Sequence, residues 1–194
     1  MKALYQASQK ITRRLLIKLV ATGALGASFG TLSTALLTRA GSASPQKARF
    51  LSGSETRTLE AICERVIPRD DAPGATDLGV VNYIDKNLRG HFAKHQATYR
   101  KGIAAVEATA RSLHGNPFTR IHPDRQDSLL ESLESGKVSK QLWTETDPKA
   151  FFALVVAHTM QGFYGPPRHG GNRDYLSYKM LDLDYPQVIG QNRY

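Results

Sequence analysis

The amino-acid sequence predicts an all-α protein, a small irregular helical bundle followed by a long, mostly non-regular C-terminal arm. Apolar residues recur at helical spacing in five segments beyond residue 50, and caps, prolines or glycines mark the ends of these segments. No window alternates apolar and polar residues for long, which argues against a sheet. We divide the 194 residues into a leader, 1–43, a linker, 44–50, and a helical domain, 51–194.

The first helix is predicted between Ser52 and Pro68. Ser52 and Glu55 have the spacing of a capping box, in which each side chain binds the backbone N–H of the other residue. Pro68 ends the helix because its ring cannot continue one. The apolar face of this helix is formed by Leu59, Ile62, Cys63 and Val66.

Three further helices follow at regular intervals. The second is expected to start near Thr76–Asp77 and to end at Gly90. The third runs from about His91 to Leu113, with Leu113 on its buried stripe, and the fourth from Asp124 to Ser135. Their apolar residues keep the 3.6-residue period of an amphipathic helix.

The fifth helix has the clearest start. Asp147 is placed as its N-cap and Pro148 in its first turn, where the missing N–H of proline costs nothing. Gly162 is placed at its end. The residues between are apolar nearly all round, so we expect this helix at the centre of the bundle.

Cys63 is the single cysteine of the chain. An intramolecular disulfide, a four-cysteine iron–sulfur site and a Cys-x-x-Cys-His haem attachment are therefore excluded on this chain. A buried position is favoured for Cys63, because unpaired cysteine is among the most buried residue types. A disulfide to another subunit is the alternative.

The net charge of +9 arises mainly in the leader, which has six basic residues and no acid, so the rest of the chain carries +3. Without a long basic run, this gives little support for nucleic-acid binding. His91 and His95 are four residues apart, but a solvated helix face is favoured over a metal pair. His158 is favoured as a hydrogen-bonded core histidine over a general base. We assign no catalytic, cofactor-binding or metal-binding residue to this chain.

The leader contains a twin-arginine motif followed by an uncharged stretch, 19–38, and small residues up to Ala43. The motif consists of Arg13, Arg14, Leu16, Ile17 and Lys18. This order is typical of a bacterial twin-arginine export signal cleaved after Ala43. Retention of the leader as a membrane anchor is the alternative, since the stretch is long enough to span a bilayer.

The segment after Gly162 combines aromatic residues, arginines and paired glycines. This composition is typical of protein–protein interfaces. An arm folded on its own core explains it equally well. The candidate interface residues are Phe163, Tyr164, Arg168, His169, Gly170, Gly171, Asn172, Arg173, Tyr175 and Tyr178.

Several of these motifs resemble the small (gamma) subunit family of membrane-bound gluconate 2-dehydrogenase. The matching segments are 146–152, 162–164, 170–174 and 178–180, together with 59–62, 66–68, 73–75 and Asp85. The chain departs from many members of the family at His169, where they have tyrosine, and at Tyr178, where they have tryptophan.

The resemblance implies a three-part, membrane-bound enzyme that oxidises D-gluconate to 2-dehydro-D-gluconate. A flavoprotein of the glucose–methanol–choline oxidoreductase type would hold FAD, and a multihaem cytochrome c would pass electrons to the quinone pool. This chain would carry no cofactor. It would bind the flavoprotein and, through the twin-arginine translocase, export it to the periplasm, where the complex is attached to the inner membrane.

Three alternatives stay open at this point. The first is a small subunit of a related FAD-dependent glucose or other sugar dehydrogenase. The second is a stand-alone periplasmic enzyme that uses His158 or His169. The third is a structural protein anchored in the membrane by an uncleaved leader.

Overall fold

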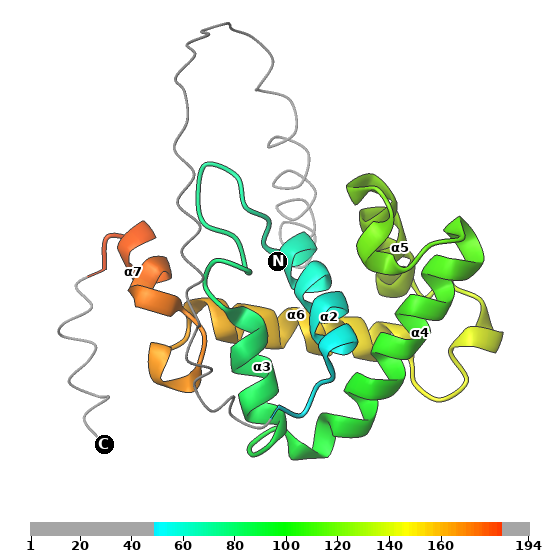
Figure 1. Ribbon diagram of the computed structural model, residues 1–194, viewed down its shortest axis with the longest axis horizontal. Coiled ribbons are helices and arrows are strands. Elements are labelled where there is room, and N and C mark those ends of the chain that lie inside the picture. Colours follow the sequence, from blue (N-terminus) through cyan, green and yellow to red (C-terminus); the bar gives the residue numbers. More distant parts are fainter. Residues whose placement is uncertain (1–48, 184–194) are drawn as a thin grey trace, which may run out of the picture. The chain divides into compact units, whose positions relative to one another are not determined.

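The computed structural model describes residues 49–183, and in this range the chain is helical and without strands (Figure 1). The predicted all-α fold is confirmed. The leader with Arg13 and Arg14, the cleavage point at Ala43 and the tail beyond residue 183 lie outside the described residues. The helices are α2 (Gly53–Val66), α3 (Val80–Leu88), α4 (Gln96–His114), α5 (Pro123–Ser135), α6 (Pro148–Tyr164) and α7 (Leu176–Met180).

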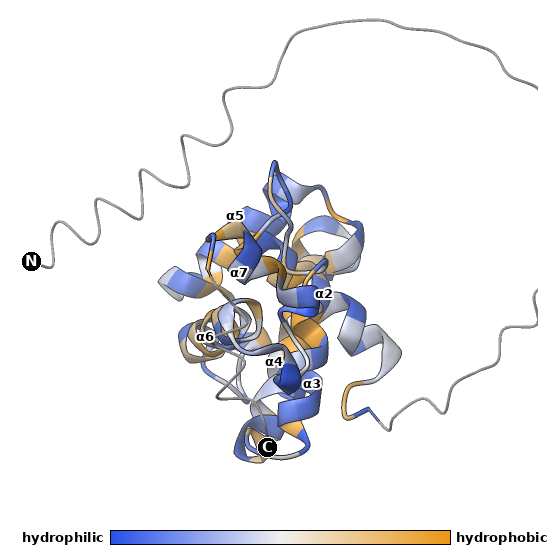
Figure 2. Ribbon diagram, turned by 90° about the vertical axis from the view of Figure 1, so that its left-hand side faces the viewer, coloured by the Kyte–Doolittle hydropathy of each residue, from blue (hydrophilic) through white to orange (hydrophobic). Residues whose placement is uncertain are grey.

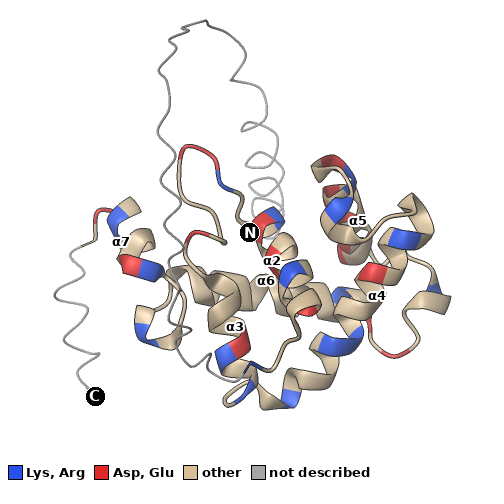
Figure 3. Cartoon of the chain, in the orientation of Figure 1, with Lys and Arg blue, Asp and Glu red and all other residues tan. Residues whose placement is uncertain are grey.

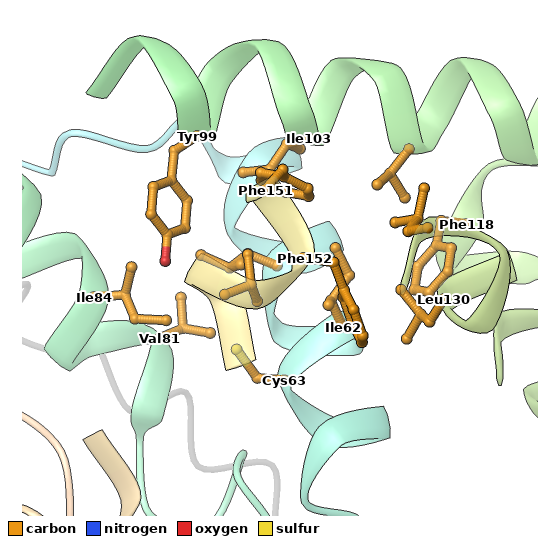
Figure 4. Close-up of a cluster of buried hydrophobic side chains, with 14 of the residues drawn as sticks. Ile62, Cys63, Val81, Ile84, Tyr99, Ile103, Phe118, Leu130, Phe151 and Phe152 are labelled. Atoms are coloured by element: carbon orange, nitrogen blue, oxygen red, sulfur yellow. The ribbon is translucent and has the colours of Figure 1, made fainter. Parts of the chain in front are cut away.

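Helix α6 lies at the centre of the bundle, as its all-round apolar sequence predicts. It packs against α2, α3, α4, α5 and α7. Phe151 and Phe152 of α6 lie among side chains from the surrounding helices (Figure 4), and Phe151 is fully buried. The labelled neighbours in this cluster include Ile62 of α2, Ile84 of α3, Ile103 of α4 and Leu130 of α5.

The predicted caps form the hydrogen bonds expected of them. Ser52 and Glu55 make both bonds of the capping box at the start of α2. At the start of α6, the Asp147 carboxylate accepts the N–H of Ala150 at 2.7 Å. Gly136 ends α5 in the left-handed conformation, with φ +72°.

Two helices begin later than the sequence predicts. Helix α3 starts at Val80 rather than near Asp77, because Gly79 adopts φ +68° and interrupts the helix. The Asp77 carboxylate instead closes the preceding loop by accepting the N–H of Gly74 at 2.9 Å. Helix α4 starts at Gln96 rather than His91, since a turn and the short 3₁₀ helix η1 (Ala93–His95) come first.

Two further predictions about helix surfaces and ends are wrong. Helix α6 continues past Gly162 to Tyr164. Leu113, predicted on the buried stripe of α4, is 62 % exposed. Residues 111–113 are all exposed, so the last turn of α4 projects past the helices that α4 packs against.

Asp85 fixes the beginning of the domain to α3. Its side chain is buried, and Oδ1 accepts the backbone N–H groups of Phe50 at 3.0 Å and Leu51 at 2.8 Å. These bonds satisfy donors that precede α2 and would otherwise be removed from water. Leu51 is thereby held in the hydrophobic core.

Cys63 lies in the core on α2, with 1 % of its surface exposed. The hydroxyl of Thr159 on α6 donates to its sulfur at 3.2 Å. Burial raises the pKa of the thiol to about 12, so it stays protonated and unreactive at neutral pH. This position favours a packing role, because a disulfide to another subunit would require α2 to move away from α6.

His158 is a core histidine enclosed by aromatic rings. Only 4 % of its surface is exposed, and its ring stacks on Phe92 with 3.8 Å between centroids. Its Nδ1 and the hydroxyl of Tyr99 are 3.0 Å apart. Burial, together with neighbouring His95, lowers the pKa of His158 to about 4. The ring is therefore neutral at physiological pH.

We expect the fold to lose stability as the pH falls from about 6.5 to 4. In this interval the unfolded chain binds a proton at His158, with its ordinary pKa of 6.5, and the folded chain does not. The linked loss in free energy of unfolding is about 3 kcal/mol at pH 4. Urea denaturation at a series of pH values measures it.

The variant His158→Asn separates this effect from general acid denaturation, because the amide oxygen replaces Nδ1 as an acceptor for Tyr99 and does not titrate. Its stability should start lower at pH 7 and fall less steeply between pH 6.5 and 4 than that of the wild type. Identical slopes for the two proteins would show that His158 does not carry the pH dependence.

Candidate partner-binding site

The C-terminal arm, residues 165–183, follows α6 directly and folds back beside it (Figure 1). It contains the short 3₁₀ helices η4 (Pro167–His169) and η5 (Arg173–Tyr175) and then α7. Helix α7 packs against α6, and η4 packs against α3. The arm thus lies on the described domain.

Asn172 fastens the arm to the end of α6 and is fully buried. Its backbone N–H donates to the carbonyl of Gly162 at 2.9 Å, and its side-chain Nδ2 donates to the carbonyl of Gly165 at 3.0 Å. Its Oδ1 accepts the N–H of Ser177 at the start of α7 at 2.9 Å. Through its backbone and its side chain, Asn172 therefore connects α6, the turn after it and α7.

Two glycines allow this close approach. A β-carbon at Gly171 would overlap the carbonyl oxygen of Gly162. A β-carbon at Gly162 would lie 3.0 Å from the ring of Tyr83 on α3. Gly162, predicted to end the helix, is instead a contact point inside it. We refer to Gly162, Gly171 and Asn172 together as the arm clasp.

Two further hydrogen bonds hold the arm beside α3. The N–H of Arg173 donates to the carbonyl of Leu78 at 3.1 Å, just before α3 begins. The Nζ of Lys86 donates to the carbonyl of Arg168 at 2.6 Å. Both bonds use backbone atoms of the arm, so they fix its path and leave the arginine side chains exposed.

The turn within the arm is strained. Asn172, Asp174 and Tyr175 have φ values of +42°, +55° and +58°. Asparagine and aspartate tolerate this left-handed region, whereas it costs a residue such as tyrosine about 1–2 kcal/mol. The arm clasp and the bond from Arg173 to Leu78 hold the turn in this shape.

The structure divides the ten predicted interface residues into two groups. Four are buried: Phe163 near the end of α6, and Gly171, Asn172 and Tyr178 in the arm. Those that remain accessible are Tyr164, Arg168 and Arg173, which are exposed, and His169, Gly170 and Tyr175, which are partly so. The sequence pattern could not separate these groups, because the separation depends on contacts with α3 and α6.

Large apolar side chains are also exposed on α6, at the end of α7 and just after it, and of these only Tyr164 was predicted from the sequence as an interface residue. We call Met160, Tyr164, Met180, Leu181 and Leu183 the α6–α7 apolar set; each is at least 41 % exposed. Figure 2 shows the hydropathy of these helices. Met160 and Tyr164 are four residues apart and therefore share a face of α6. Large apolar residues exposed on elements that pack together are typical of interaction sites.

His169 is held as a hydrogen-bond acceptor on the arm. Partial burial and the cations of Arg168 and Lys86 lower its pKa. The neutral ring accepts a hydrogen bond at Nε2 from Nε of Arg168, at 3.0 Å. This hydrogen bond holds the Arg168 guanidinium group beside His169 on the arm.

Between residues 49 and 183, no group of three or more His, Cys, Asp or Glu side chains is placed to hold a metal ion. Helices within these same limits are too short or too polar to cross a bilayer.

We expect Asn172→Ala to lower the free energy of unfolding by about 3 kcal/mol. The substitution leaves the N–H of Ser177 and the carbonyl of Gly165 without partners and places alanine in the left-handed region. Urea denaturation followed by circular dichroism measures the change. Asn116→Ala is the matched control, since Asn116 is exposed and bonds only to the nearby carbonyl of His114. Equal effects of the two substitutions would contradict the clasp.

Comparison with known proteins identifies the family of this chain. A family model described as gluconate 2-dehydrogenase subunit 3 matches residues 53–184. No curated protein and no solved structure matches the chain. The matched range begins with α2, passes through the core helices and includes the whole arm. This chain therefore belongs to the gluconate 2-dehydrogenase subunit 3 family.

Proposed function

We propose that this chain is the small accessory subunit of a membrane-bound gluconate 2-dehydrogenase. It binds an FAD-containing catalytic subunit of the glucose–methanol–choline type, and its twin-arginine leader carries that subunit to the periplasm. The observation that carries the proposal is the family match over residues 53–184, which covers the helical domain and the arm together.

The α6–α7 apolar set supports a protein partner on this side of the domain. Large exposed methionine, tyrosine and leucine side chains contribute much binding free energy when a partner removes their apolar surface from water. The arm is held by the clasp before any partner binds, so little conformational entropy remains to be lost on association. Arg168 and Arg173 lie at the same segment and offer guanidinium groups for the polar rim of such an interface.

In this proposal the chain holds no cofactor itself. FAD belongs to the catalytic subunit and haem c to a multihaem cytochrome that attaches the complex to the inner membrane. The cytochrome passes the electrons taken from D-gluconate to the quinone pool. The twin-arginine route suits such a complex because it carries proteins that have already folded.

Leu181→Asp should weaken the complex with the flavoprotein at least about tenfold, because a carboxylate would be buried in an apolar interface. Co-purification from cells that express both subunits, followed by a titration of the purified proteins, measures the effect. Leu113→Asp is the matched control: Leu113 is 62 % and Leu181 55 % exposed, and Leu113 lies at the end of α4. Unchanged binding by Leu181→Asp, or equal loss in both variants, would exclude the α6–α7 apolar set as the interface.

Replacing both Arg13 and Arg14 by lysine should leave the flavoprotein in the cytoplasm with this subunit bound, because the pair is the recognition element of the leader. Cell fractionation with an activity assay on each fraction tests this. Arg39→Lys serves as the control, being a conservative change in the same leader outside the motif. Normal amounts of periplasmic flavoprotein in the double variant would contradict the export role.

A further inference from the structure

A cleft of about 580 Å³ lies between α2, α4 and the segment that leads into the 3₁₀ helix η2 (Phe118–Arg120). Four arginines line it: Arg57 of α2, Arg100 and Arg111 of α4, and Arg120 of η2. Figure 3 shows the basic residues of α2 and α4 in blue; in this view α7 lies at the left, and α2 and α4 lie to its right. Ile103, Ala104 and Pro117 contribute apolar lining.

The two acidic residues of the cleft are already engaged by the protein itself. Oε2 of Glu55 accepts the N–H of Ser52 at 2.8 Å in the capping box. Oε1 of Glu107 accepts the hydroxyl of Thr58 at 2.8 Å, and its Oε2 lies 3.6 Å from Arg111. These two carboxylates face four guanidinium groups, so the cleft keeps an excess of positive charge.

Two of the arginines are available for a ligand. Between residues 49 and 183, neither Arg57 nor Arg120 has an ion-pair partner, and both are exposed. Guanidinium groups of this kind bind carboxylates through paired hydrogen bonds. The cleft thus favours an anionic ligand with carboxylate groups.

The spacing of the arginines argues for a ligand longer than a single small anion. Arg100 and Arg111 are eleven residues apart on one helix face, roughly 16 Å along its axis. Arg100 is fixed at one end, with its guanidinium carbon 4.5 Å from the ring centroid of Phe50 and its NH2 group donating to the Phe50 carbonyl at 3.2 Å. Arg111 is held toward Glu107. An extended chain covers that distance with about five residues.

We infer that this cleft binds an extended acidic segment of a partner protein. Carboxylates of the segment pair with the exposed Arg57 and Arg120, and its backbone follows α4 over the apolar lining between Arg100 and Arg111. The inference is independent of the proposed function, because it uses a different surface from the arm and does not require the partner to be the flavoprotein.

A fluorescein-labelled decapeptide of alternating glutamate and glycine tests the inference by fluorescence anisotropy with the full-length chain. We expect binding at low salt that weakens as salt is added. Arg57→Gln combined with Arg120→Gln should weaken binding by about tenfold or more, since two charge-assisted contacts are lost. Arg89→Gln combined with Arg125→Gln is the matched control, because it removes the same charge from exposed sites outside the cleft. This control should change the affinity less than about twofold.

Four results would overturn the inference. The first is no binding of the peptide by the wild type at low salt. The second is equal weakening in both double variants, which indicates long-range attraction to the overall charge. The third is displacement of the peptide by an equal concentration of free glutamate, which indicates a site for a single anion. The fourth is binding of phosphatidylserine vesicles, lost in the Arg57 and Arg120 variant, without binding of the peptide.

Discussion

The contact between the carbonyl of Gly162 and the Gly171–Asn172 backbone decides how the C-terminal arm is arranged on the described domain. It requires a residue without a side chain at position 171 and brings Asn172 into the protein interior, where its amide group connects three segments. The turn through Asp174 and Tyr175 is strained and depends on this anchor. Without the contact, α7 and the exposed apolar residues that follow it would have no fixed position relative to α6.

Helix α6 serves the core and the candidate interface at the same time. Its first half buries Phe151 and Val155 among the other helices, and its last turns present Met160 and Tyr164 to solvent. A helix this apolar can have both roles because the neighbouring helices bury some of its apolar side chains and leave others exposed to solvent. The family match over residues 53–184 includes this helix and the arm.

The local features of the fold could be predicted from the sequence, whereas the contacts between distant segments could not. The caps at Ser52 and Asp147 depend on neighbouring residues, and so they were identified correctly. The start of α3 depends on Gly79, whose left-handed conformation no spacing pattern reveals. Gly162 was predicted to end the helix because glycine often follows a helix. The structure shows another reason for glycine at this position, which is the close approach of Gly171 and Tyr83. The arm was identified by its composition, and its division into buried and exposed residues required the structure.

Hydrogen–deuterium exchange on the full-length chain, alone and co-purified with the flavoprotein, tests the central claim most directly. The claim is that the domain uses the end of α6 and the arm to bind its partner. It predicts that residues 157–164 and 174–183 exchange more slowly in the complex, while α5 is unchanged. Unaltered exchange in those two segments, with slowing confined to other helices, would contradict it.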